Sequence, residues 1–110
     1  MEKSSLKYNA QFERNEREIP TIAEEAVAFL HFPKQEVLRL RQELKERTDF
    51  LLYLMNQLNV RILQVRILFE DIAGAKKIDA TLTKVLENEL IIHPDMRIPI
   101  HRIKQIRVIE

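Results

Sequence analysis

The chain has 110 residues, of which 45% are apolar and 32% charged, and this suits one globular domain of the usual size of about 100–150 residues. Its 18 Lys and Arg stand against 17 Asp and Glu, so a formal net charge of +1 argues against a strongly basic nucleic-acid protein. The absence of cysteine excludes disulfides and thiolate sites. With no apolar run near the roughly 20 residues of a membrane span and no signal-peptide pattern, we expect a cytoplasmic protein.

Residues 1–20 contain few large apolar side chains and show no helical period. We predict a mobile N-terminal arm there. Thr21 and Glu24 follow at the spacing of a capping box, in which the Thr side chain accepts the N–H of the Glu. This spacing predicts a short helix over residues 22–31, ending before Pro33 because the residue preceding a proline resists the helical region.

A second helix is predicted from Pro33, whose missing N–H would be unpaired at the first helical position anyway. Glu43 and Arg47 lie one turn apart in the order that favours an ion pair. Large apolar residues recur every seventh position as in a coiled-coil seam, namely Val37, Leu44, Leu51 and Leu58. We predict two helices over residues 21–58. The seam is a candidate helix–helix interface, and its alternative role is to pack on the domain's own sheet.

Leu38, Phe50 and Leu52 lie off this seam. A helix that buries only one face would therefore expose large apolar groups, which is typical of a contact surface. We expect a homo-oligomer, at least a dimer.

From Val60 the chain becomes rich in β-branched residues, and Leu63, Val65, Ile67 and Phe69 alternate with their neighbours, which predicts a strand. The alternative is that residues 59–72 continue the preceding helix, since Val65 and Ile72 extend the heptad row.

Beyond the single glycine, Gly74, the alternating residues and the turn at residues 87–89 predict a β-hairpin. A helix over residues 79–90 fits the leucine spacing as an alternative. A turn at Pro94-Asp95, a short strand at residues 97–100, a tight turn at 101–104 and a last strand at 105–109 complete the predicted order.

This order resembles the small SH3-like barrel of Sm-like proteins. The segments that carry the resemblance are Lys77-Ile78-Asp79, Glu89-Leu90-Ile91-Ile92 and residues 98–106, IPIHRIKQI. The last segment looks most like the end of YolD-like proteins of bacteria and phages, which also place a helix before the barrel, and the match covers about residues 34–110. The resemblance implies a five-stranded antiparallel barrel over residues 59–110. Together with the two helices predicted above, this gives an α+β fold in which an N-terminal helical hairpin precedes the barrel. The resemblance also implies an accessory subunit of a translesion DNA polymerase.

Catalytic patterns are missing from the sequence. The only serines, Ser4 and Ser5, lie in the predicted arm, and a single glycine leaves no phosphate-binding loop. His93, Asp95 and His101 lack the spacing of a metal site. We expect no enzyme, no cofactor, no metal and no small-molecule substrate.

Four cations near the C-terminus fall within eleven residues that contain no acid. If the intervening isoleucines point inward, the cations form a basic rim, made of Arg97, Arg102, Lys104 and Arg107. The rim either protects exposed strand edges from unwanted pairing or contacts the phosphates of a nucleic acid. Few aromatic residues follow Tyr53, which disfavours base stacking. We therefore favour a protein-interaction module and keep nucleic-acid binding as the alternative.

Overall fold

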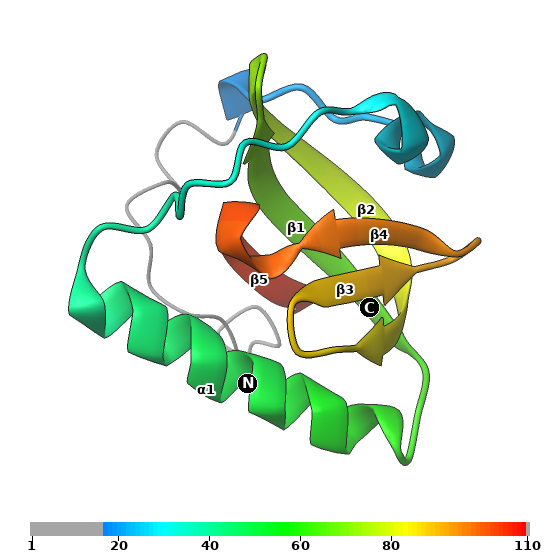
Figure 1. The fold of residues 1–110 in the computed structure, drawn as a ribbon. Coiled ribbons are helices and arrows are strands. Elements are labelled where there is room, and N and C mark those ends of the chain that lie inside the picture. The colour runs from blue at the N-terminus through cyan, green and yellow to red at the C-terminus, as the bar shows by residue number, and fades with distance from the viewer. Residues whose placement is uncertain (1–16, 110) are drawn as a thin grey trace.

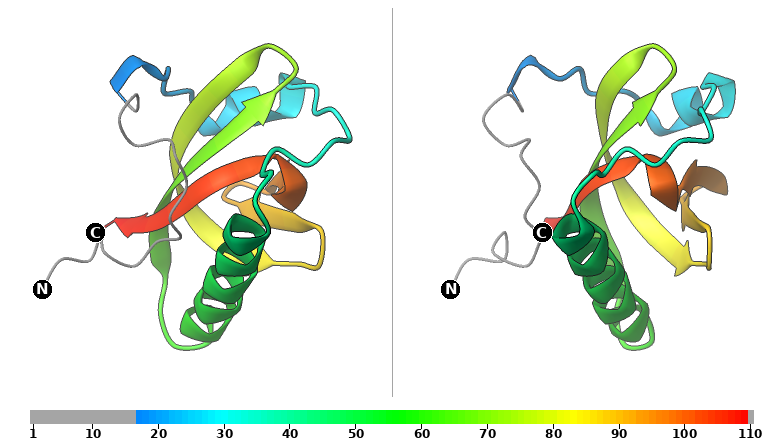
Figure 2. Two further views of the ribbon diagram at one scale, coloured as in Figure 1. Left: turned by 90° about the vertical axis from the view of Figure 1, so that its left-hand side faces the viewer. Right: turned by 60° about the vertical axis from the view of Figure 1, so that its left-hand side comes forward.

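The computed structural model describes residues 17–109. The elements in chain order are the 3-10 helix η3 (Glu24–Phe29), helix α1 (Arg41–Leu58), strands β1 (Leu63–Asp71), β2 (Gly74–Val85), β3 (Glu89–Ile92) and β4 (Met96–Pro99), the 3-10 helix η4 (Ile100–Arg102) and strand β5 (Ile103–Ile109). Figure 1 shows α1 and η3 at opposite ends of a strongly curled sheet, and the views in Figure 2 agree.

The five strands form one antiparallel sheet in the order β4-β3-β2-β1-β5. The α+β class and the five strands are therefore as predicted. Residues 59–72 and 79–90 contribute β1 and parts of β2 and β3, so their helical alternatives are wrong. Strands β4 and β5 are the two edges of the sheet, and no pairing joins them in the part of the chain that the structure describes. The sheet is thus an open one, and barrel closure is not observed.

The hairpin between β1 and β2 depends on the single glycine. Asp71 pairs with Gly74, so the loop holds only two residues. Gly74 has a φ of 131°, in a region that side chains with a Cβ rarely adopt. The side chain of Asp71 closes the turn by accepting the N–H of Ala73 at 3.1 Å and by pairing with Lys76 Nζ at 2.6 Å.

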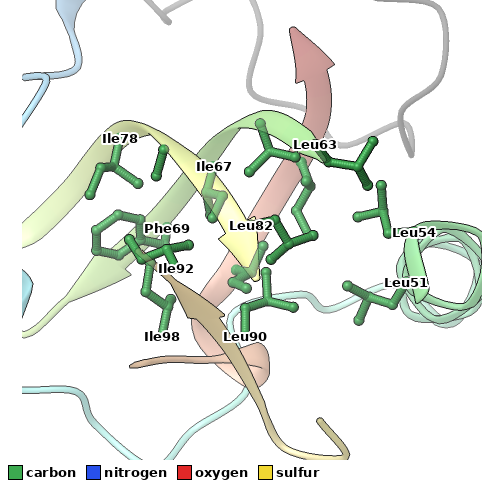
Figure 3. Packing of buried hydrophobic residues seen from close by; sticks show 14 of the residues in the cluster. Leu51, Leu54, Leu63, Ile67, Phe69, Ile78, Leu82, Leu90, Ile92 and Ile98 are labelled. Atoms are coloured by element: carbon green, nitrogen blue, oxygen red, sulfur yellow. The ribbon is translucent and has the colours of Figure 1, made fainter. Parts of the chain in front are cut away.

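The core lies on the concave side of the sheet, where alternating residues of β1 and β2 meet α1 (Figure 3). The strands contribute fully or almost fully buried aliphatic and aromatic side chains, among them Leu63, Val65, Ile67, Phe69, Ile78 and Leu82. Leu51 and Leu54 of α1 join the same cluster. Burying a side chain of this size stabilises the fold by about 1.5–3 kcal/mol relative to leaving it exposed.

The predicted helical hairpin is not present in the described residues. Only η3 forms within residues 22–31, and Thr21 caps no helix. Thr21 instead bridges to Lys77 of β2, and the N–H of Ile22 donates to the carbonyl of Lys77 at 3.0 Å. Backbone pairing with the sheet thus replaced a local cap whose sequence signature is present.

The long helix begins at Arg41 and not at Pro33. Residues 30–40 cross the molecule without forming a helix. Val37 N–H donates to the carbonyl of His101 at 2.9 Å, so this part of the predicted seam lies on the crossing segment. Contacts with η4 therefore outweighed the continuous heptad pattern, as tertiary contacts often do.

Residues 1–16 of the predicted arm lie outside the described residues. At the end of that predicted arm, Ile19 is buried and the carbonyl of Pro20 accepts the N–H of Lys77 at 2.9 Å. These two residues therefore contact the folded domain. No helix within residues 17–109 is long and apolar enough to cross a membrane.

Candidate interaction surface

The four C-terminal cations do not line up as one rim. Arg97 lies on β4, where its Nη1 is 2.9 Å from Oε1 of Glu89. Arg102 is 7% exposed, so the prediction that it points outward is wrong. Lys104 Nζ lies 3.9 Å from Glu70 Oε2. Arg107 on β5 lies opposite Arg66 of β1 in the register of the two strands.

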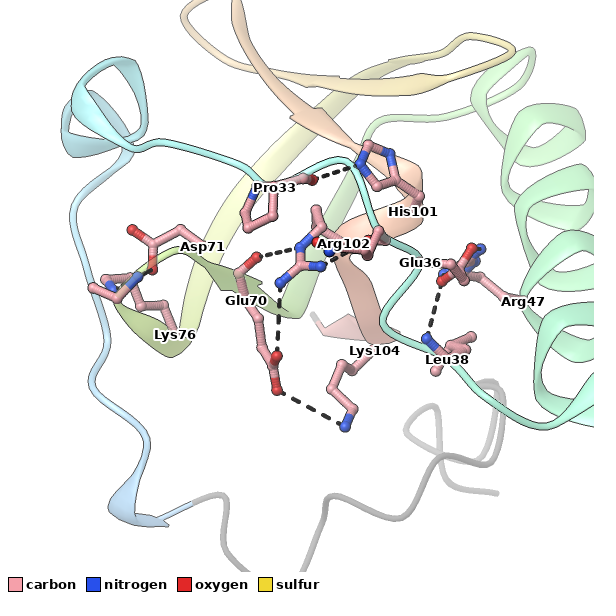
Figure 4. Close-up of polar contacts among 12 residues, drawn as sticks. Pro33, Glu36, Leu38, Arg47, Glu70, Asp71, Lys76, His101, Arg102 and Lys104 are labelled. Atoms are coloured by element: carbon pink, nitrogen blue, oxygen red, sulfur yellow. Dashed lines mark hydrogen bonds and ion pairs between the residues drawn. The ribbon is translucent and has the colours of Figure 1, made fainter.

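Arg102 fastens three separate segments to one another (Figure 4). Its Nε donates to the carbonyl of Glu70 on β1 at 3.0 Å, and its Nη1 donates to the carbonyl of Gln35 on the crossing segment at 2.7 Å. The carboxylate of Glu70 lies 3.8 Å from Nη2. Arginine suits this position because its planar fork presents several donors at once.

A second buried arginine, Arg47, binds the same crossing segment. Its Nη1 donates to Oε2 of Glu36 at 2.8 Å and to the carbonyl of Ile103 at 2.9 Å. Arg47 therefore pairs with a residue outside the helix, and the predicted pair with Glu43 does not form. We call the set Glu36, Arg47, Glu70, His101 and Arg102 the polar clasp.

Two carboxylates, Glu36 in the clasp and Asp71 near it, have a lowered pKa. Burial alone would raise the pKa of Glu36, but hydrogen bonds from Arg47 and the Leu38 N–H, with the charges of Arg47 and His101, lower it below its ordinary value. At the β1–β2 hairpin, burial alone would raise the pKa of Asp71. The hydrogen bond and charge of Lys76, together with two backbone N–H groups, outweigh this effect, so the pKa is lowered.

A row of charges crosses the exposed face of three strands. Arg66 Nε donates to Oδ1 of Asp79 at 2.7 Å, and Arg107 stands next to Arg66 on β5. The hydrogen bond from Arg66 is the main reason that the pKa of Asp79 is lowered, and the charge of Arg107 contributes. Arg107 thus belongs to a mixed-charge row and not to a purely basic surface.

The side chains of the heptad seam pack against the protein's own core. Leu51 is buried in the core cluster, and the other three seam residues pack against that cluster as partly buried side chains, namely Val37, Leu44 and Leu58. Its packing on the domain's own sheet is therefore confirmed. Pairing of these side chains with another helix stays a prediction.

A different face of α1 is open. Leu52 is 53% exposed and Met55 is 41% exposed. They border a groove of about 180 Å³ between the second half of α1 and the end of β2, and its apolar lining consists of Leu51, Leu52, Met55, Val85, Leu86 and Ile100. Thr48 and Glu87 complete the lining. We call this feature the α1 groove.

The part of α1 from Phe50 onward, beside the groove, carries no charge. From Phe50 to Val60 the sequence contains no Asp, Glu, Lys or Arg, although a third of the chain is charged. The loop that follows adds Val60 and Ile62, each 76% exposed. Apart from Arg61 in the loop and Glu87 in the groove lining, this exposed surface is uncharged and largely apolar, which is typical of the centre of a protein interface. The sequence pattern places Leu52 off the seam, but it does not show the groove.

Within the described range no group of three or more His, Asp or Glu side chains could hold a metal ion. His101 lies at the clasp, where its Nε2 is 2.9 Å from the carbonyl of Pro33, while His93 is exposed.

Comparisons with protein-family models, with curated proteins and with solved structures found no match for the chain. The function is therefore inferred from the residues and their geometry.

Proposed function

We propose that the protein is a non-enzymatic protein-interaction module and that the α1 groove is its binding surface. One observation carries this proposal: the uncharged end of α1 leaves Leu52 and Met55 exposed beside an apolar groove. Packing within the domain gives no reason for such a surface, because the seam on the opposite side of α1 already supplies the contact with the sheet.

We also infer that the curled sheet is of the SH3-like, Sm-like type. The strand order with β5 beside β1, and the single 3-10 turn η4 between β4 and β5, support this assignment. The resemblance to YolD-like proteins suggests the assembly in which the module works. It would serve a DNA polymerase of translesion synthesis as an accessory subunit.

The arrangement of the cations disfavours the alternative of a nucleic-acid binder. Arg97, Arg102 and Lys104 each face a carboxylate of the same chain. A phosphate would have to compete with these carboxylates, and contacts with several phosphates are needed for appreciable affinity. We expect the purified protein to show no salt-sensitive binding to single-stranded DNA or RNA at physiological salt.

Site-specific photo-crosslinking in the source cells tests the proposal. A photoreactive residue at position 52 should give discrete protein adducts that are resistant to high salt, because apolar contacts are not screened. The matched control carries the same residue at position 72, since Ile72 is also exposed but lies at the β1–β2 turn. Absence of adducts from position 52, or an equal pattern from both positions, would refute the module. Salt-sensitive nucleic-acid binding by the wild type would favour the alternative.

A further inference from the structure

The outer side of α1 changes character along its length. Residues that share this side recur at three- and four-residue spacing, and all of them are exposed, namely Arg41, Lys45, Thr48, Leu52, Met55 and Asn59. The first two are charged and the last four are neutral. Lys45 is engaged with Asp49 at 2.7 Å, so the charged turns are already balanced within the helix. The neutral turns flank the α1 groove.

The α1 side of the groove carries no charge, and the exposed Glu87 is the one charged residue of the lining. The neutral side restricts what can bind there. A partner that presents charges would lose their hydration and find no opposite charge at the end of α1, which carries a desolvation cost. A partner must therefore present an apolar, uncharged surface of its own. The same stretch of a second copy meets this requirement, because a neutral apolar patch is complementary to itself, whereas a patch of one charge repels its copy.

We propose that the occupant of the α1 groove is the α1 end of a second copy, related by a two-fold axis. This inference rests on the proposed function, of which it names the partner. Each copy offers a projecting part, Leu52 with Met55, and a recess, the groove beside them. In a two-fold contact the projection of one copy meets the recess of the other twice, so both apolar features are covered at once. Met55 suits the centre of the contact because its unbranched side chain adapts to irregular gaps.

The size of the surface sets the strength of the dimer. Stable interfaces involve about 20–30 residues on each side, whereas the neutral part of α1, the following loop and the groove lining make a smaller patch. We therefore expect a reversible dimer with a dissociation constant in the micromolar range.

Light scattering across a micromolar concentration series measures this directly. The mass should rise from 13.1 kDa toward twice that value as concentration increases. Leu52→Glu and Leu52→Lys should each remain monomeric, because each places like charges across the axis, and an equimolar mixture of the two should again form a dimer. Ile72→Glu is the matched control, since it adds a charge at an exposed apolar position outside the groove, and it should dimerise like the wild type.

The absence of cysteine from the chain allows a second measurement that does not depend on charge. Met55→Cys should form an intermolecular disulfide under mild oxidation faster than Ile72→Cys, because only residues near the axis bring their Cα atoms within about 7 Å. Equal rates for the two variants would overturn the proposal.

The two proposals can fail separately. A wild type that stays monomeric throughout the concentration series would overturn the second copy as occupant. If position 52 then still crosslinks to a different protein in cells, the interaction module survives. If it crosslinks to nothing, both proposals fail.

Discussion

The two ends of α1 use charge in opposite ways. At its beginning, Arg47 reaches Glu36 and the carbonyl of Ile103, and the neighbouring Arg102 fastens the crossing segment to β1 (Figure 4). At its end, from Phe50 to Val60, there is no charged residue, and Leu52 and Met55 face outward.

The difference shows where the domain obtains its fixed shape and where it is left free to bind. Residues 30–40 form no helix or strand of their own, so their polar groups need partners elsewhere in the fold. Arg102 donates to the carbonyl of Gln35. Arg47 binds the carboxylate of Glu36 and joins it to the carbonyl of Ile103 on β5. The end of α1 already has its helical hydrogen bonds and a buried seam, so its outer apolar residues contribute nothing evident to the isolated domain.

The largest expected effect comes from breaking the polar clasp at Arg102. Arg102→Ala removes two hydrogen bonds that a charged side chain donates, and it leaves the carbonyls of Glu70 and Gln35 without this donor. Each such bond is worth about 1.5–3 kcal/mol, so we expect a loss of about 3 kcal/mol in the free energy of unfolding. The melting temperature of a domain of this size should fall by about 15 °C.

Chemical denaturation with urea measures this loss of stability. The variant Arg102→Lys separates the contribution of the positive charge from that of the guanidinium geometry. Lysine keeps the positive charge but lacks the planar fork that reaches two carbonyls, so the variant should recover only part of the stability. Full recovery by lysine would mean that charge alone holds the segment, contrary to the geometry described above.

Acid should destabilise the domain through Glu36, the clasp carboxylate with a lowered pKa. The pKa of Glu36 is lowered from its ordinary value of 4.5, so its contribution to stability is fully present above that value and is lost as pH falls through the lower, folded-state value. Glu36→Gln should cost about 1 kcal/mol at neutral pH, a modest figure because solvent screens a partly exposed carboxylate.

Thermal melts between neutral pH and pH 3 measure this dependence. The wild type should lose stability below about pH 4.5, and Glu36→Gln should lose less over the same interval because it has no carboxylate to protonate there. Asp71 adds a parallel acid dependence, since its pKa is lowered from 3.8 by Lys76. Identical pH profiles for the wild type and Glu36→Gln would contradict a role for this carboxylate in the clasp.

The sheet could be predicted from the sequence because its signals are local. Alternation from Leu63 to Phe69 reports which side chains face the core, and Gly74 marks a turn that needs positive φ. The beginning of α1 could not be predicted in this way. Val37 fits the heptad perfectly, yet its N–H is bound to His101, far along the chain.

The candidate surface likewise depends on contacts between residues far apart in the chain, which the sequence pattern does not show. The heptad seam was a real signal of burial, but a sequence pattern does not say whether a helix packs on its own sheet or on another chain. Leu52 fell outside the seam and marked the open side of α1, whereas the groove depends on Val85, Leu86 and Ile100, which only the folded chain brings beside it. Arg102 was grouped with Arg97 because both are cations on a predicted outer face.

The smallest effect should come from Arg97, and it completes the comparison between buried and exposed charge. Arg97 and Arg102 are five positions apart, yet the side chain of Arg97 is 53% exposed and that of Arg102 only 9%. The pair that Arg97 makes with Glu89 is solvated on both sides, and exposed ion pairs contribute at most about 1 kcal/mol. Arg97→Gln keeps the length of the side chain and should change the free energy of unfolding by less than about 0.5 kcal/mol in urea denaturation.

Because the variant also removes one cation from the predicted rim, the same sample tests phosphate binding: its affinity for single-stranded DNA should match that of the wild type. A loss comparable with that of Arg102→Ala would show that exposure does not govern what these cations contribute, and the contrast between the two ends of α1 would lose its physical basis.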